Sequence, residues 1–152
     1  MKRFLPLPLC ILLVLSLAIS ASAEVDNGDV VIFTEETIME GGLTVVDEVI
    51  EHTQTRAAAK NYTRKKSIYD GDTLIAVIAF TATFHYDGST VSVTSKSVTQ
   101  TDTYEGWSYK QDSFTSSGGT VTLSGKLTKW LIFNSSFSMG LVCDVNGNIT
   151  ST

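Results

Sequence analysis

The stretch that decides the fold is Leu74-Ile75-Ala76-Val77-Ile78-Ala79-Phe80-Thr81-Ala82-Thr83-Phe84-His85-Tyr86. Every second residue from Leu74 to Tyr86 is apolar, so one face of an extended chain here is continuously apolar. The intervening residues are also apolar as far as Ala79 and become polar from Thr81 onward. The pattern therefore predicts a long strand whose first half is covered on both faces and whose second half has one face in water.

The flanking sequence keeps the two-residue period, and turn signals such as Asp70-Gly71-Asp72 separate its segments. About seven short strands are predicted, and Val98 falls out of phase with Val93, which indicates a bulge near residues 95–97. Residues 43–152 are therefore expected to form an all-β, antiparallel β-sandwich, with an Ig-like fold or a small barrel as the alternative. Its expected core comprises Ile78, Phe80, Phe84, Val121, Leu123, Leu141 and Cys143.

The first 23 residues have the three parts of a secretory signal peptide. Lys2 and Arg3 provide the basic start, residues 9–19 are an apolar run, and Ala21-Ser22-Ala23 fits a cleavage site. The run is shorter than the roughly 20 apolar residues that span a bilayer. We therefore expect cleavage after Ala23, secretion, and no stable membrane anchor.

Residues 24–42 are acidic and end in Gly41-Gly42, which is typical of a loosely ordered leader. They contain one apolar cluster, Val30-Val31-Ile32-Phe33, after which Thr34 could cap a short helix. The predicted organisation is thus a signal peptide at 1–23, an acidic leader at 24–42 and a β-domain at 43–152.

Charge is segregated along the chain, which has 16 acidic and 11 basic side chains. Residues 24–55 carry nine acids and no base, whereas residues 56–66 carry five bases and no acid. An acidic chain lacks the basic face that nucleic acid requires, so no such partner is expected. The basic run is interpreted as a solvated edge strand protected against aggregation, and alternatively as a contact for an anionic surface; it comprises Arg56, Lys60, Arg64, Lys65 and Lys66.

After cleavage Cys143 is the one remaining cysteine, because Cys10 leaves with the signal peptide. Cys143 falls on the apolar phase of a predicted strand that also contains Met139 and Leu141. We interpret it as a buried and inert side chain. An intermolecular disulfide and a catalytic nucleophile are the alternatives.

Other chemistry-bearing residues do not form a recognisable site in the sequence. His52 and His85 lack the spacing of metal ligands and are interpreted as solvated or edge residues. Residues 144–148 resemble the start of a calcium loop, but Ile149 stands where the loop needs glycine, so a hairpin turn is expected. Trp107 is assigned to the core, because Tyr104 falls on the opposite strand face and divides a sugar-stacking platform that would also include Tyr109.

Short motifs follow one another at residues 80–90, Trp107, Ser117-Gly118-Gly119-Thr120-Val121 and residues 141–149. In this order they resemble small secreted β-rich proteins of Gram-positive, especially gut-dwelling, bacteria, whose function is unknown. The similarity runs from about Leu43 to the C-terminus. The resemblance implies a bacterial source. It also implies a second cysteine early in the strand after the turn at Asp87-Gly88, where this chain has Val93, so the implied disulfide is absent here.

These features together predict a secreted, monomeric, non-enzymatic module that acts by surface adhesion or partner binding. Its partner is expected to be an extracellular protein or a cell-surface polymer. No catalytic residue, metal site or cofactor is assigned. The alternatives are a small secreted hydrolase acting on cell-wall or peptide substrates, and a secreted antimicrobial or competition factor.

Overall fold

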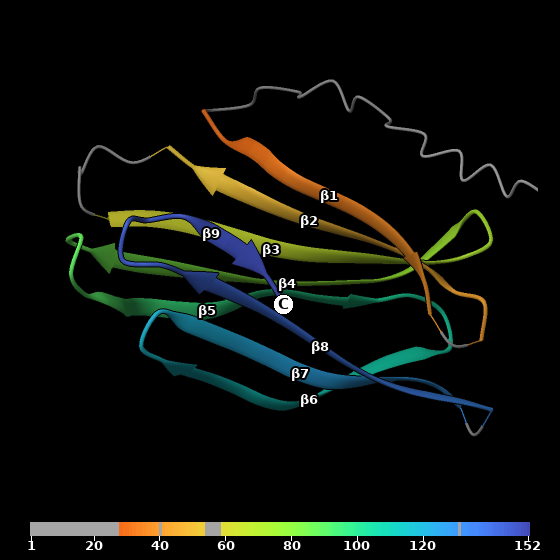
Figure 1. The fold of residues 1–152 in the computed structure, drawn as a ribbon. Coiled ribbons are helices and arrows are strands. Elements are labelled where there is room, and N and C mark those ends of the chain that lie inside the picture. Colours follow the sequence, from red (N-terminus) through yellow and green to blue (C-terminus); the bar gives the residue numbers. More distant parts are fainter. Residues whose placement is uncertain (1–27, 40, 54–58, 131) are drawn as a thin grey trace, which may run out of the picture.

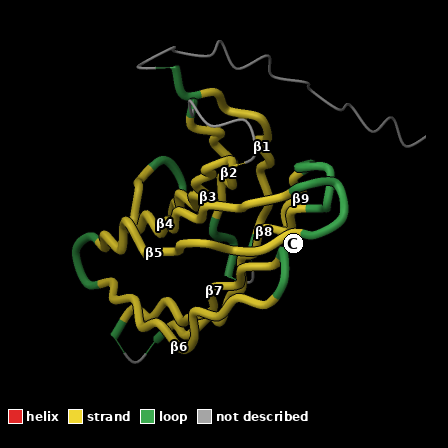
Figure 2. Tube along the Cα trace, turned by 90° about the vertical axis from the view of Figure 1, so that its left-hand side faces the viewer, coloured by secondary structure: helices red, strands yellow, loops and turns green. Residues whose placement is uncertain are grey.

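A computed structural model describes residues 28–39, 41–53, 59–130 and 132–152. These residues form nine strands and no helix, arranged as two antiparallel sheets (Figures 1 and 2). The predicted signal peptide at 1–23 lies outside them. One sheet contains β1 (Val30–Ile38), β2 (Thr44–His52), β3 (Ala59–Asp70), β4 (Thr73–Tyr86) and β5 (Val91–Thr103), and the other contains β6 (Trp107–Ser117), β7 (Thr120–Lys129), β8 (Phe133–Cys143) and β9 (Ile149–Ser151).

Each strand pairs with the next one along the chain, in the orders β1-β2-β3-β4-β5 and β6-β7-β8-β9. The all-β class and the antiparallel sandwich are confirmed, with nine strands instead of about seven. The sheets do not close into a barrel. Two successive meanders also differ from the Greek-key connections of an Ig domain.

The decisive stretch forms β4, an interior strand of the five-stranded sheet. Its residues from Ile75 to Phe80 are all buried, as the uninterrupted apolar run predicts. Thr81 and Thr83 are half-buried and alternate with the buried Ala82 and Phe84. The change from continuous to alternating burial within this strand is therefore as predicted.

The core lies between the two sheets. All seven predicted core residues are at most 2% exposed. Within this core the Phe80 ring lies 5.5 Å from that of Phe114, and Tyr62 meets Phe84 edge to face. A second cluster at the other end of the sandwich gathers around Trp107, Leu127, Leu43, Val45, Ile68, Ile75 and Ala76.

Tight turns join the strands where the sequence predicts them. β3 ends at Asp70 and β4 begins at Thr73, so Gly71, with φ of 58°, sits at the bend. Gly147, in the turn before β9, has φ of 83°. A Cβ at Gly147 would lie 2.4 Å from the ring of Tyr86, so this position requires glycine for space as well as for conformation.

The prediction of a loosely ordered leader over 24–42 is wrong for residues 30–38. They form β1, which pairs antiparallel with β2 in a register that places Glu36 opposite Val46. The helix considered after Thr34 does not form either. The cause is tertiary: the exposed edge of β2 offers backbone partners to a segment whose first four residues, 30–33, favour extended structure.

Irregular pairing between β4 and β5 corrects one further detail. The ladder shifts between Ala79 and Phe80 and again between Thr83 and Phe84, which leaves Thr99 and Thr94 out of the pairing. The single bulge predicted near residues 95–97 is therefore two bulges that flank this segment. The bulge at Thr94 accounts for the phase change between Val93 and Val98, because it is the one that lies between them.

Candidate functional site

The edge strand β1 has an unusually apolar exposed surface. Val30, Val31 and Ile32 are 40–49% exposed, and Ile38 is 76% exposed. Phe33 is half-buried and packs against the core. Natural edge strands are normally blunted by charge, proline or cover, and a long apolar edge tends to pair with another chain.

The outward backbone groups of β1 can be assigned from its pairing. Met39 N donates to Leu43 O at 2.8 Å, and these residues continue the register in which Ile38 faces Thr44. Because hydrogen-bonded and non-hydrogen-bonded pairs alternate in antiparallel sheets, the N–H and C=O groups of Thr34, Glu36 and Ile38 point away from β2. Among the strands that the structure describes, this part of β1 pairs with β2 alone, so its outward groups form a ladder open to a further strand.

A groove runs between β1 and the short strand β9. The bulge between Val31 and Phe33 places Ile32 at the groove. The groove has a volume of about 330 Å³ and is lined by Ile32, Phe33, Val49, Ile149, Thr150 and Ser151. β1 is the outermost strand on this side of the molecule (Figure 1), and β9 has only three residues. The inner face of β1 is consequently only partly covered by the second sheet.

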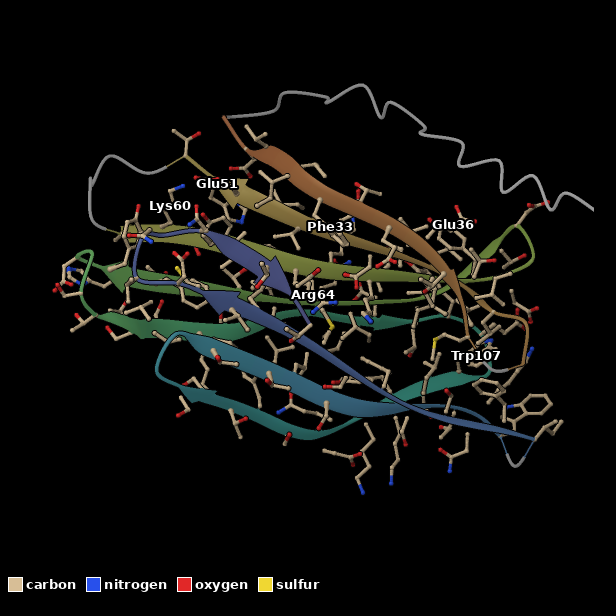
Figure 3. The ribbon with its side chains drawn as sticks, viewed as in Figure 1. Phe33, Glu36, Glu51, Lys60, Arg64 and Trp107 are labelled. Atoms are coloured by element: carbon tan, nitrogen blue, oxygen red, sulfur yellow. The ribbon has the colours of Figure 1, made fainter. Side chains whose placement is uncertain are left out.

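A charged cluster lies between the sheets below this groove. Arg64 and Asp47 are 4% and 5% exposed, and they form a bidentate pair with distances of 3.0 and 2.6 Å (Arg64 is labelled in Figure 3). Arg64 Nη1 also donates to the carbonyls of Gly140 and Thr152. The guanidinium thus satisfies backbone oxygens where β8 and β9 meet.

The interpretation of the basic run as a solvated edge strand is wrong. β3 is the middle strand of the five-stranded sheet, and Arg64 points inward. Lys66 also points inward, 3.5 Å from Asp47, and burial lowers the pKa of its ammonium while Asp47 opposes that shift. The basic run also compensates part of the preceding acidic segment, because Lys60 pairs with Glu51 and Lys65 with Glu48. Arg56 lies outside the described residues.

These pairs leave the acids of β1 without an equivalent partner. Glu35 and Glu36 form no salt bridge with any basic side chain in the described residues. Both are exposed, and Glu36 extends from β1 in Figure 3. The edge therefore combines an apolar half, residues 30–33, with an acidic half at residues 35–36.

His52 is part of a chain of hydrogen bonds across the first three strands to β4. Its Nδ1 lies 2.9 Å from the Asp29 carboxylate, and its Nε2 lies 2.7 Å from the Thr63 hydroxyl. Thr63 Oγ1 is in turn 2.7 Å from Thr81 Oγ1. A proton on Nδ1 bonded to Asp29 leaves Nε2 to accept the hydroxyl proton of Thr63. This order of carboxylate, imidazole and hydroxyl is also the order of a nucleophile relay.

The position of Thr63 weakens a catalytic role for the relay of Asp29, His52 and Thr63. Thr63 lies in the interior strand β3, where its neighbours on both sides are paired in the sheet ladder, so nearby amides are engaged instead of free to stabilise an oxyanion. His85 is exposed and pairs in the ladder with Ala59 and Ser92, apart from this relay. The interpretation of His52 as a solvated residue is incomplete, because its ring is hydrogen-bonded on both nitrogens.

Cys143 is 2% exposed and belongs to the main core cluster, as predicted. Burial raises the pKa of its thiol, and the neighbouring Asp144 carboxylate raises it further. A thiol of this kind is a poor nucleophile at neutral pH, because the thiolate is the reactive form.

The aromatic residues separate as the sequence predicted. Trp107 is 9% exposed and meets the Phe133 ring edge to face at the end of the sandwich where Figure 3 labels it. Tyr109 stacks on Phe137, and burial raises the pKa of its hydroxyl. The most exposed aromatic at this end is Trp130, at 76%, which lies in the turn between β7 and β8 with φ of 48°.

The loop at residues 144–148 is a hairpin turn closed by its own carboxylate. Asp144 accepts hydrogen bonds from the backbone amides of Asn146 and Asn148 and from the Asn148 side chain, at 2.7–2.8 Å. These bonds lower the pKa of the Asp144 carboxyl, the Asn148 side chain contributing most. The oxygens that would ligate calcium are thus occupied within the turn.

Comparison with protein-family models, curated proteins and solved structures finds no match for this chain. In the described ranges, no group of three or more His, Cys, Asp or Glu side chains is arranged to hold a metal ion. No helix capable of crossing a membrane occurs in the same residues. The candidate site with the most distinctive geometry is therefore the β1 edge, whose apolar run the sequence contains but whose pairing with β2 it does not reveal.

Proposed function

We propose that the protein is a secreted, non-enzymatic module that binds an extracellular protein through the edge of β1. The observation that carries this proposal is the open ladder of a nine-residue strand on which four apolar side chains are 40–76% exposed. A protein partner is favoured over a sugar or phosphate polymer, because only a peptide backbone can continue the ladder. Secretion is supported by the signal-peptide pattern at 1–23, and a bacterial source by the resemblance.

Repulsion between the glutamates of two β1 strands supports a monomeric protein in the absence of the partner. In an antiparallel pair of two β1 strands centred on Thr34, Glu35 and Glu36 of one copy would lie opposite the apolar half of the other copy. The pair would also gather four carboxylates near its centre. In-register parallel pairing sets Glu35 beside its own copy, which is also unfavourable. The acidic half of the edge therefore discourages self-association while leaving the ladder open to another protein.

The proposal is tested by photo-crosslinking with a reactive residue introduced in place of Ile38 and, as a control, in place of His85. Extracellular proteins from the native surroundings serve as the source of partners. We expect crosslinked products from position 38 and not from position 85. They should disappear in Thr34→Pro, which removes an outward amide without removing a β1–β2 bond, and remain in Thr34→Ala. Equal products at both positions, or products that survive Thr34→Pro, would overturn the proposal.

A small hydrolase is the second candidate, favoured by the distances within Asp29, His52 and Thr63 alone. Its test is the hydrolysis of an activated ester by the exported protein. A catalytic relay predicts that Thr63→Val and His52→Gln each abolish the activity, whereas Thr81→Val retains it. A structural hydrogen-bond chain predicts no activity above background in any of these proteins.

A further inference from the structure

We infer that the partner presents an extended segment in which two adjacent basic residues precede a short run of apolar residues, and that this segment adds to β1 as an antiparallel strand. The inference rests on the proposed function and specifies the chemistry of the partner. It follows from the order of side chains along β1, which is apolar over residues 30–33 and acidic at residues 35–36.

Main-chain pairing fixes the orientation. All ladders in the described residues are antiparallel, and antiparallel pairs are slightly more stable per residue than parallel ones. A strand that runs antiparallel to β1 first passes Ile38, then the two glutamates and last the apolar half. Its basic residues must therefore lie on the N-terminal side of its apolar residues.

Both faces of the added strand find complementary neighbours. Phe33 packs on the core and defines the inner face of β1, so Glu35 also faces inward while Glu36 faces outward. Two consecutive basic residues on the partner point to opposite faces, and each therefore meets one glutamate. The following apolar residues then lie beside Ile32 and Phe33, with the groove next to β9 available to one side chain.

The acids are available for this role because the other acids of the region are already paired. Asp47 is buried against Arg64, Glu48 pairs with Lys65, and Glu51 pairs with Lys60. Glu35 is the one acid of the edge with a nearby interior cation, since it contributes to the electrostatic environment of Lys66. Glu36 forms no salt bridge within the described residues and provides the cleaner test of charge recognition.

The probe is a synthetic nine-residue peptide with two adjacent lysines near its N-terminus and alternating valine and threonine in its C-terminal half. A second peptide carries glutamates in place of the lysines. Binding to the exported protein is measured by fluorescence anisotropy at low salt. We expect the lysine peptide to bind at least tenfold more tightly than the glutamate peptide, with the preference shrinking as salt screens the charges.

Three protein variants locate the preference for the lysine peptide on β1. Glu36→Lys should weaken the lysine peptide and strengthen the glutamate peptide, each by up to about fivefold in Kd, as expected for one exposed ion pair. Thr34→Pro should remove binding of both peptides, and Thr34→Ala should remove neither. Circular dichroism confirms that each variant is folded.

The outcomes separate this inference from the proposed function. One outcome is that crosslinking at position 38 depends on the Thr34 amide while the two peptides bind equally well. That outcome overturns the inference of a basic segment in the partner but is consistent with binding at the β1 edge. A lysine preference that survives Thr34→Pro overturns strand addition. Loss of the preference in Glu36→Lys, with binding retained in Thr34→Ala, supports the inference.

Discussion

The five-stranded sheet has two edges, and they are built in opposite ways. β5 consists mostly of Ser and Thr, carries Lys96 and has two bulges. Its Val93 N donates to Gly118 O in the turn between β6 and β7, so part of its ladder is already engaged. β1 has one bulge, four exposed apolar side chains and outward backbone groups at Thr34, Glu36 and Ile38.

The two edges of this sheet are therefore protected against pairing to different extents. Polar side chains and bulges on β5 are the usual devices against unwanted pairing. β1 has such devices only in part, because its bulge lies at Ile32 and its polar side chains at residues 34–37, while four apolar side chains stay exposed. This exposed apolar surface is the reason to assign β1 a binding role.

The largest expected effect is a difference in unfolding free energy between a core substitution beside β5 and one on β1. Phe80 is fully buried and pairs in the ladder with Val98 of β5, whereas Phe33 is only half-buried on β1. Phe80→Ala should cost about 3–5 kcal/mol of unfolding free energy, the usual range for a buried aromatic. Phe33→Ala should cost roughly 1–2 kcal/mol, because part of the Phe33 side chain is already in water.

Urea denaturation measures both values, and alkylation of the buried Cys143 thiol reports the same opening independently. If Phe33→Ala proves as destabilising as Phe80→Ala, β1 is a fully integrated strand and the contrast between the two edges disappears.

A second prediction concerns the charges that hold β2 and β3 together beneath β1. Arg64→Ala leaves the buried Asp47 without its bidentate partner, with Lys66 remaining 3.5 Å away, and should cost about 3 kcal/mol. Lys65→Ala removes a half-buried pair with Glu48 and should cost at most about 1 kcal/mol. Changing Asp47 and Arg64 together to alanine should cost less than the sum of the single changes, since neither member of the buried pair is left behind and Lys66, which loses its acid, is partly exposed. Additive effects in thermal or urea unfolding would contradict the assigned pair.

How much of this could be predicted from sequence depends on whether the signal is local. β4 was predictable because its burial follows directly from a run of continuous and then alternating apolar residues, from Leu74 to Tyr86. The turns at Gly71 and Gly147 were predictable because glycine carries its own conformational preference. β1 was not, because residues 24–42 are acidic and glycine-ended, and their order comes from pairing with β2.

The burial of Arg64 in β3 could not be predicted either, because it also depends on pairing with another strand. A run of five basic residues is typically solvated, and nothing in the local pattern separates Arg64 from Lys65. Their alternation in a strand does place them on opposite faces, and the acids of residues 47–48 have the same alternation. A search for two oppositely charged segments at hairpin spacing could have paired Asp47 with Arg64 and Glu48 with Lys65. The relay at His52 joins residues from four segments and had no comparable signal.

A smaller effect tests the apolar surface directly. Ile38→Lys on β1 should change the unfolding free energy by no more than about 0.5 kcal/mol, because the side chain is 76% exposed. It should lower the fluorescence of a hydrophobic dye bound to the folded protein. Thr101→Lys on β5 is the matched control and should leave dye binding unchanged. Equal dye binding by both variants would mean that the apolar surface of the molecule lies elsewhere.

The smallest expected effect concerns the turn that leads into β5. The Asp87 carboxylate accepts hydrogen bonds from the backbone amides of Ser89 and Thr90, at 2.9 and 2.7 Å, and from the Thr90 hydroxyl. These bonds lower the pKa of the Asp87 carboxyl below its ordinary value of 3.8, with the Thr90 amide contributing most. A carboxyl whose pKa is lower in the folded state stabilises the fold above its unfolded pKa. That contribution is lost as the pH falls from about 4 through the folded value.

Asp87→Asn should therefore lower the urea midpoint at pH 7 and flatten its decline below about pH 4, because the variant has no carboxyl to protonate. Hydrogen exchange should quicken at the amides of Ser89 and Thr90, where β5 begins, and remain unchanged along β1. Asp72→Asn, in the turn between β3 and β4, is the matched control and should keep the wild-type pH dependence. If exchange quickens along β1 as well, the two edges open together and cannot be assigned separate roles.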